Sequence, residues 1–207
     1  NENNLNIPDG MSVTFFGLSG EKQAVIGVKG IDIAGSHSFI KFENVEIAGK
    51  AKKADGNSTT NDYLFNQSKA STVGTIEFSN SFISGFKNTP VRLQGSDSKI
   101  IDLVKFENCT VYGADSRTYS LIHIDAGSGK GKIDNIEFSK TTVVYSGKCL
   151  VYSRNTDFTS LKLSDCTFSK LLGSGDYILD CDKNGNPVTN NATTRYTMNW
   201  YEALGYV

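Results

Sequence analysis

With 207 residues, 38% of them hydrophobic, the chain is long and apolar enough for one domain with a sizeable core, which excludes a disordered chain. Its 21 basic and 22 acidic residues give a formal net charge of −1, which argues against the broad basic surface that nucleic acid requires. No apolar run approaches the ~18 residues that cross a bilayer, so no membrane insertion is expected.

Short β-type segments separated by Gly and Asn predict an all-β chain. The first segments lie at 13–15, 24–28 and 31–33. From residue 38 onward one template, apolar-x-apolar-x-Asn-small-x-apolar, occurs five times. The central apolar residues of the five copies are Phe42, Phe78, Phe106, Phe138 and Leu163. Constant strands separated by unequal loops are typical of a parallel β-helix, in which each coil adds a rung to a stack.

The Asn position of the template predicts a bend between two strands. Side chains alternate along a strand, so Phe42 points inward, yet Val45 has to point inward again after Asn44. Asn tolerates a left-handed backbone, which permits this change of phase. Lys140 and Asp165 hold the same position in the last two copies.

Two further patterns follow from stacking the copies. The outward residues just before the central position alternate in sign, so vertical neighbours ~4.8 Å apart carry opposite charges. These residues are Lys41, Glu77, Lys105, Glu137 and Lys162. Five residues before the central position another residue is predicted to point inward; these are His37, Val73, Ile101, Ile133 and Phe158. His37 is interpreted as a turn residue or a hydrogen-bonded core histidine.

A second strand recurs in every coil, at 63–66, 91–94, 122–125, 151–154 and 179–182. Aligning these strands places outward side chains in two rows along the stack. The first row is predicted to contain Leu64, Arg92, His123, Tyr152 and Asp180. The second row is predicted to contain Asn66, Gln94, Asp125, Arg154 and Asp182.

Together these patterns predict an all-β fold, a single-stranded right-handed parallel β-helix of about five to six coils, built by one domain over residues 1–207. Residues 10–37 form the opening coil and residues 38–182 the repeat coils. Residues 183–207 are expected to form a C-terminal cap or tail, because an uncovered β-edge invites aggregation.

On these Asn-bearing segments the chain resembles the pectin-lyase-like superfamily of right-handed β-helices, over roughly residues 10–182. The opening segment 13–26 is similar to uncharacterised, secreted β-helix domains of gut polysaccharide-degrading bacteria. The resemblance implies a secreted or cell-surface protein that handles polysaccharide. Polygalacturonase-like members carry Asn-Thr-Asp, Asp-Asp, Gly-His-Gly and Arg-x-Lys motifs. Only the tripeptide Asn-Thr-Asp occurs in this sequence, at residues 155–157, and the other three motifs do not occur.

The two rows supply the candidate substrate-binding residues. They are Arg92, Gln94, His123, Asp125, Tyr152 and Arg154. Planar donors engage sugar hydroxyls or uronate carboxylates, and Tyr offers an apolar face to a sugar ring. The alternative interpretation is an ordinary solvated sheet face that polar residues decorate.

No catalytic residues are assigned. His123 and Asp125 lie two residues apart on one strand face, ~7 Å, which is too far for a direct hydrogen bond. The chain is therefore expected to bind polysaccharide, acidic or neutral, without cleaving it. Two alternatives stay open: a polysaccharide lyase or glycoside hydrolase acting on uronate-containing glycans, and a structural or adhesive spacer.

Asp180, Asp182 and Asn184 match the first half of a calcium loop, with Gly185 at the sixth position. An Asn-Gly turn that ends the last strand is the alternative, so calcium is only a possible cofactor. The four cysteines are Cys109, Cys149, Cys166 and Cys181. Cys109 and Cys166 occupy the same template position two rungs apart, ~9.6 Å, beyond disulfide reach, and all four are expected to be reduced.

Overall fold

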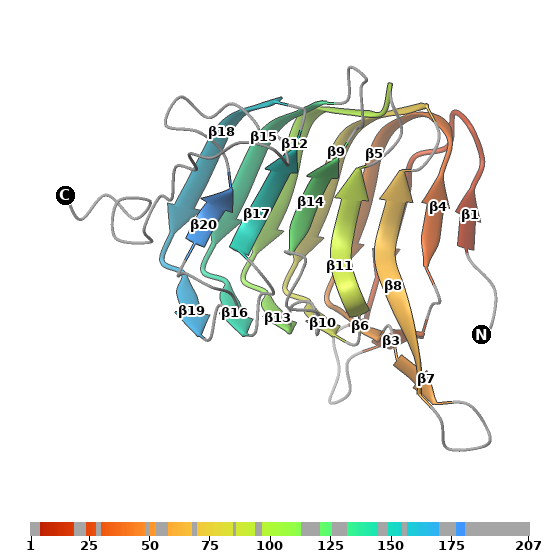
Figure 1. Cartoon of the computed structure of the whole chain (residues 1–207). Helices are drawn as coiled ribbons and strands as arrows, with labels where there is room; N and C mark the ends of the chain where they lie inside the picture. The colour runs from red at the N-terminus through yellow and green to blue at the C-terminus, as the bar shows by residue number, and fades with distance from the viewer. Residues whose placement is uncertain are drawn as a thin grey trace.

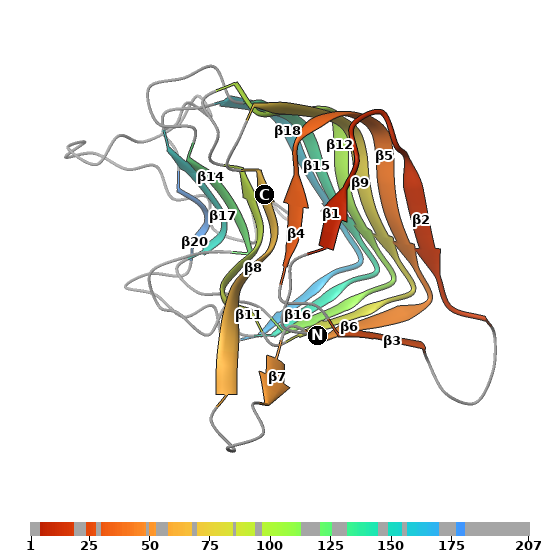
Figure 2. The same cartoon turned by 90° about the vertical axis from the view of Figure 1, so that its right-hand side faces the viewer.

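The computed structural model describes residues 5–18, 24–27, 30–48, 50–52, 58–67, 70–84, 86–93, 97–112, 121–125, 132–144, 149–154, 157–169 and 177–180. Within these ranges every regular element is a β-strand, and the strands form three stacked parallel sheets (Figure 1). The end-on view in Figure 2 shows the three sheets facing a common interior. The chain is thus all-β, with an arrangement compatible with a parallel β-helix.

Each sheet takes strands from successive coils. Sheet 1 contains β1 (Leu5–Ile7), β4 (Ile31–Ile33), β8 (Ser58–Gln67), β11 (Phe86–Leu93), β14 (Ile122–Asp125), β17 (Cys149–Arg154) and β20 (Tyr177–Asp180), and β7 (Lys50–Lys52) pairs antiparallel with β8. Sheet 2 contains β2 (Val13–Phe16), β5 (Gly35–Glu43), β9 (Ser71–Ser79), β12 (Lys99–Glu107), β15 (Lys132–Ser139) and β18 (Asp157–Ser164). Sheet 3 contains β3 (Ala24–Gly27), β6 (Val45–Ala48), β10 (Phe82–Ser84), β13 (Thr110–Tyr112), β16 (Thr142–Val144) and β19 (Thr167–Ser169).

A column of stacked aromatic rings fills the interior behind sheet 2. The rings of Phe15, Phe42, Phe78, Phe106 and Phe138 follow one another at centroid distances of 4.8, 5.3, 4.7 and 4.8 Å. Strand pairing places the same template position of successive coils side by side, so the rings stack offset and nearly parallel. The predicted core register of the template is confirmed.

The corner between sheets 2 and 3 has the predicted left-handed backbone. All five template positions have positive φ, from 48° to 55°; they are Asn44, Asn80, Asn108, Lys140 and Asp165. After four of the five corners the next residue donates a side-chain hydrogen bond to the carbonyl oxygen two residues before it, whereas the apolar Val45 follows Asn44. The donors are Ser81, Cys109, Thr141 and Cys166. In these four coils the small position of the template holds a hydrogen-bond donor, which satisfies a backbone oxygen where the strand ends.

Two details of the predicted register are wrong. Ile100, not Ile101, points inward, and Ile101 is 45% exposed. The pairing of β12 with β9 shifts between Ile100 and Leu103, because β12 carries one residue more than its neighbour, a β-bulge. In sheet 1, Asn66 rather than Leu64 pairs with Arg92, and Leu64 is buried. A shift by two residues keeps the alternation of faces, so the pattern alone could not exclude it.

His37 is a hydrogen-bonded core histidine, which was one of the two interpretations of this residue; the other was a turn residue. Its side chain is buried, its Nδ1 lies 2.6 Å from the Met11 carbonyl oxygen, and its Nε2 lies 3.0 Å from that of Ala34. The imidazole therefore links the segment before β2 to β5 and supplies polar contacts at a position that is apolar in the other coils.

Cys109 and Cys166 are free thiols, as predicted. The side chain of Cys149 and the whole of Cys181 lie outside the described residues. Burial raises the pKa of the Cys109 thiol to about 11, and burial likewise raises the pKa of Cys166. Both groups are therefore neutral hydrogen-bond donors at neutral pH.

The high pKa of Cys109 predicts a loss of stability in alkali. The folded protein keeps a proton that the unfolded chain gives up, so the free energy of unfolding should fall between about pH 9 and about pH 11, by roughly 2 kcal/mol. Denaturant titrations across this range should show the fall. The Cys109→Ser variant, which copies Ser81 one coil away, should lack this component. Identical pH profiles for the two proteins would contradict the assignment.

Candidate functional site

The structure places the backbones of some of the predicted sheet 1 residues side by side. One row aligns residues of five strands by direct pairing: Asn66, Arg92, His123, Tyr152 and Asp180. Asp125 pairs with Arg154 in the neighbouring row. The side chains of Asn66, Asp125, Tyr152, Arg154 and Asp180 lie outside the described part, as do the whole of Gln94, Asp182 and Asn184.

One described side chain of this row is buried and the other is partly buried. His123, predicted to face solvent, is only 2% exposed, and the Nε atom of Arg92 is buried as well. The prediction of an exposed His123 is therefore wrong. Alternation along a strand tells the inner face from the outer face, but it does not tell whether other parts of the chain cover the outer face. A side chain buried to this degree does not reach a polysaccharide.

Asp180 is the last residue of β20, and the remainder of the predicted calcium loop is outside the described residues. Within the described ranges no cluster of three or more His, Cys, Asp or Glu side chains is arranged to hold a metal ion.

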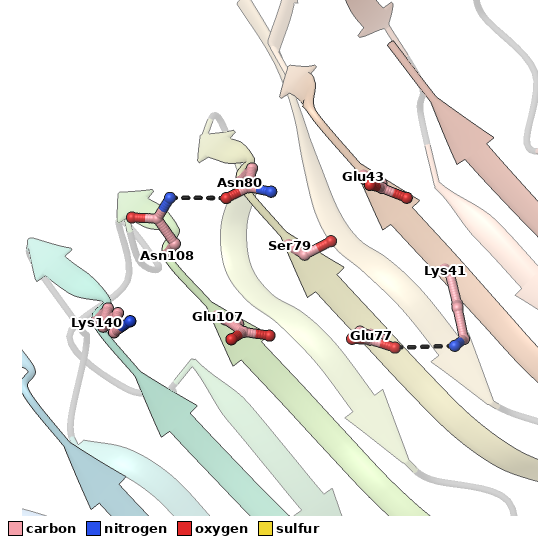
Figure 3. Close-up of a pocket in the computed structure, with 8 residues that line it drawn as sticks. All are labelled: Lys41, Glu43, Glu77, Ser79, Asn80, Glu107, Asn108 and Lys140. Carbon is pink, nitrogen blue, oxygen red and sulfur yellow. Dashed lines mark hydrogen bonds and ion pairs between the residues drawn. The ribbon is translucent and has the colours of Figure 1, made fainter. Parts of the chain in front are cut away.

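A different surface, the outer face of sheet 2, carries a hollow of about 590 Å³ (Figure 3). We call it the polar groove. Its walls are supplied by strands β5, β9 and β12 and by the corners that follow β9, β12 and β15. It is lined by Lys41, Glu43, Glu77, Ser79, Asn80, Glu107, Asn108 and Lys140. Every one of these side chains can form hydrogen bonds, and none is aromatic or aliphatic.

The polar groove owes its shape to a small residue between two large ones. Ser79 pairs with Glu43 on one side and with Glu107 on the other, and all three point outward. Figure 3 shows the two glutamates on either side of the serine. Two rungs separate them, ~9.6 Å between their strands. The short Ser79 side chain therefore leaves a depression that crosses the strands.

Two lysines of the predicted charge ladder, Lys41 and Lys105, are paired with carboxylates beside the polar groove. Lys41 Nζ lies 3.1 Å from Glu77, and Lys105 Nζ lies 3.5 Å from Glu77 and 2.6 Å from Glu107. The hydrogen bond from Lys105 lowers the pKa of Glu107, and the charges of Lys105 and Lys140 lower it further. The same hydrogen bond raises the pKa of Lys105. Glu107 is therefore ionised, and a hydrogen-bond acceptor, at any physiological pH.

Carboxamides and an aromatic ring complete this face. Asn108 donates a hydrogen bond of 2.7 Å to the Asn80 side-chain oxygen, and both residues are exposed at the corner. Phe39 stands on the outer face of β5, where Lys41 Nζ lies 5.3 Å from its ring centroid. The face thus combines carboxylates, amides and a hydroxyl with an aromatic ring, whereas the face expected on sheet 1 combined Arg, His, Tyr and a carboxamide.

Sequence reasoning missed the polar groove although its signal was present. The outward residue before each corner runs Phe16, Glu43, Ser79, Glu107, Ser139, Ser164 along the stack. The small Ser79 between the larger Glu43 and Glu107 in this row marks the depression. The prediction from the sequence aligned only the outward row two residues earlier, which carries the charge ladder that begins with Lys41.

No described residue belongs to a helix with the length and hydrophobicity of a membrane span. Comparison with models of known protein families, with curated proteins and with solved structures finds no match to the chain.

Proposed function

We propose that this chain is a secreted or cell-surface domain that binds polysaccharide without cleaving it, and that the polar groove on sheet 2 holds the glycan. The supporting observation is the lining itself, eight hydrogen-bonding side chains supplied by successive coils. Sugar hydroxyls require many donors and acceptors at fixed positions, and a rigid sheet holds their backbone positions in advance, so the main chain loses no freedom on binding. We also propose that the stack is a right-handed β-helix of the pectin-lyase-like type, with five to six coils and with residues 183–207 as its cap.

Filling the depression is the test. Ser79→Trp places a large ring between Glu43 and Glu107 and leaves the core untouched, because Ser79 points outward. Binding should first be found on a glycan array, with and without calcium, and then measured by calorimetry. Ser79→Trp should weaken it by about tenfold or more, the equivalent of roughly 1.4 kcal/mol.

The matched control is Ser164→Trp, in the same outward row beyond the groove lining. It should bind like the parent protein. An array on which the parent binds no glycan would overturn the proposal in favour of a structural or adhesive spacer. Equal binding by Ser79→Trp and the parent would also overturn it.

Glycan cleavage is the second candidate, and one observation favours it. Glu43 and Glu107 lie on either side of Ser79, on strands ~9.6 Å apart. Carboxyl groups at about the spacing of these strands would match the ~6.5–9.5 Å found in inverting glycosidases. Against it, such an enzyme needs one carboxyl that stays protonated, and the pKa of Glu107 is lowered. Reducing-end and unsaturated-product assays on each glycan bound should remain at background; turnover lost in Glu43→Gln would establish the hydrolase instead.

A further inference from the structure

An exposed aromatic residue stands at the end of the polar groove. Phe16 is the last residue of β2 and pairs with Glu43, so it occupies the outward row of Glu43 and Ser79, one rung further along. Its neighbour Phe15 points inward and stacks on Phe42, whereas Phe16 is 65% exposed. The ring contributes nothing to the core and presents its surface to solvent beside the groove.

Among the described residues the first coil carries three further exposed apolar side chains, Met11, Leu18 and Val25. Val25 is 62% exposed in β3, where it pairs with Glu46 of sheet 3. Figure 2 shows β2 and β3 on the two sides of the corner. The corner therefore separates Val25 from Phe16, which is an apolar element of the sheet 2 face next to a polar site.

The charges of the polar groove favour an uncharged ligand. Its lining contains three carboxylates, Glu43, Glu77 and Glu107, and two lysines, of which Lys41 is paired with Glu77. Among the described residues Glu43 has no ion-pair partner. An anionic polymer would meet this carboxylate and find no unpaired cluster of cations to compensate it, whereas hydroxyl groups can donate hydrogen bonds to the glutamates.

The spacing suits an extended chain of sugars. From Phe16 to Glu107 the outward row crosses three rungs, ~14 Å at ~4.8 Å per rung. One rung is comparable with the length of one hexose in an extended glycan. A chain laid along the row would meet the ring of Phe16 at one end and the carboxylates and amides of the groove at the other.

We infer that the polar groove takes a neutral, extended glycan that crosses the strands of sheet 2, with one sugar ring stacked on Phe16. This inference rests on the proposed function and specifies its ligand class. The aromatic ring supplies the apolar contact that a sugar face needs, and the groove supplies the hydrogen bonds. Phe16 acts as the platform that fixes the position of the chain along the row.

The experiment compares binding of soluble neutral glucans, mannans and xylans with that of polygalacturonate by affinity electrophoresis and calorimetry. At least one neutral glycan should bind, and polygalacturonate should bind at least about tenfold more weakly. Affinity should change less than about twofold between roughly 50 mM and roughly 500 mM salt, because no ion pair forms. Phe16→Ala should weaken binding about tenfold, Phe16→Trp should retain it, and Val25→Ala is the control that should leave it unchanged.

The possible outcomes distinguish the glycan site in the polar groove from the stacking of a sugar ring on Phe16. If Ser79→Trp abolishes binding and Phe16→Ala does not, the stacking platform is wrong and the polar groove still holds the glycan. Preference for polygalacturonate with steep salt dependence overturns the neutral ligand class. If neither variant affects binding, the proposed site itself fails. If Phe16→Ala leaves binding intact but lowers the molar mass measured by light scattering, the ring belongs to a contact between two copies of the chain.

Discussion

Replacing Phe106 by alanine is expected to lower the free energy of unfolding by about 3–5 kcal/mol. The side chain is completely buried, and its ring stacks on Phe78 at 4.7 Å and on Phe138 at 4.8 Å. Removal would leave a cavity between two rings that the sheet holds at fixed spacing, so the neighbours cannot close the gap. Urea or guanidinium titration of the variant measures the loss.

The control for this substitution is Phe16→Ala, which removes the same side chain from an exposed position and should cost less than about 0.5 kcal/mol. Phe106→Leu should cost less than the alanine variant, because Leu163 holds the equivalent position in the last copy of the template. A loss below about 1 kcal/mol for Phe106→Ala would contradict the stacked core.

Gly74→Ala is the second substitution with a large expected effect. Gly74 is a buried residue of β9, and an added Cβ would overlap the backbone carbonyl oxygen of Ser38 and come within 3.1 Å of Asp102 Oδ2. The carbonyl belongs to β5, which pairs with β9 along most of its length, so it cannot move away without loss of that pairing. We expect a loss of about 3 kcal/mol, at the upper end of the cost of overpacking.

Thermal unfolding followed by circular dichroism measures this effect, and Gly27→Ala is the matched control. Gly27 is also a strand glycine, in β3, but an added Cβ would meet no atom within 4 Å. That variant should be neutral or slightly stabilised, since alanine restricts the unfolded chain. Equal melting temperatures for the two variants would show that β5 and β9 are not packed this closely.

The parts of the fold that depend on a repeated local pattern were predictable. Phe42, Phe78 and Phe106 recur at the same place in the template, and the corner needs a residue that tolerates positive φ. The ladder that begins with Lys41 and Glu77 follows once the copies are stacked. Each of these features is required at the same template position in every coil, so the residues that satisfy it recur in the sequence at that position.

The remaining features depend on single coils, where the repeat gives no information. The extra residue of β12 exposes Ile101 through a bulge that no neighbouring coil shares. The burial of His123 depends on what covers sheet 1 from outside, which no strand pattern encodes. The polar groove depends on Ser79 being smaller than Glu43 and Glu107 beside it, a relation that appears only after three strands are aligned.

The pairing order of sheet 2 has a consequence for how the protein folds. Each strand pairs only with the strands of the preceding and following coils, in the order β18-β15-β12-β9-β5-β2. Cooperativity in such a chain is one-dimensional: order can begin at any two adjacent coils and spread in both directions, and total stability is close to a sum of coil terms and interface terms. A weak coil in the middle would therefore split the molecule into two independently melting halves, whereas a weak coil at an end would only shorten the ordered stack.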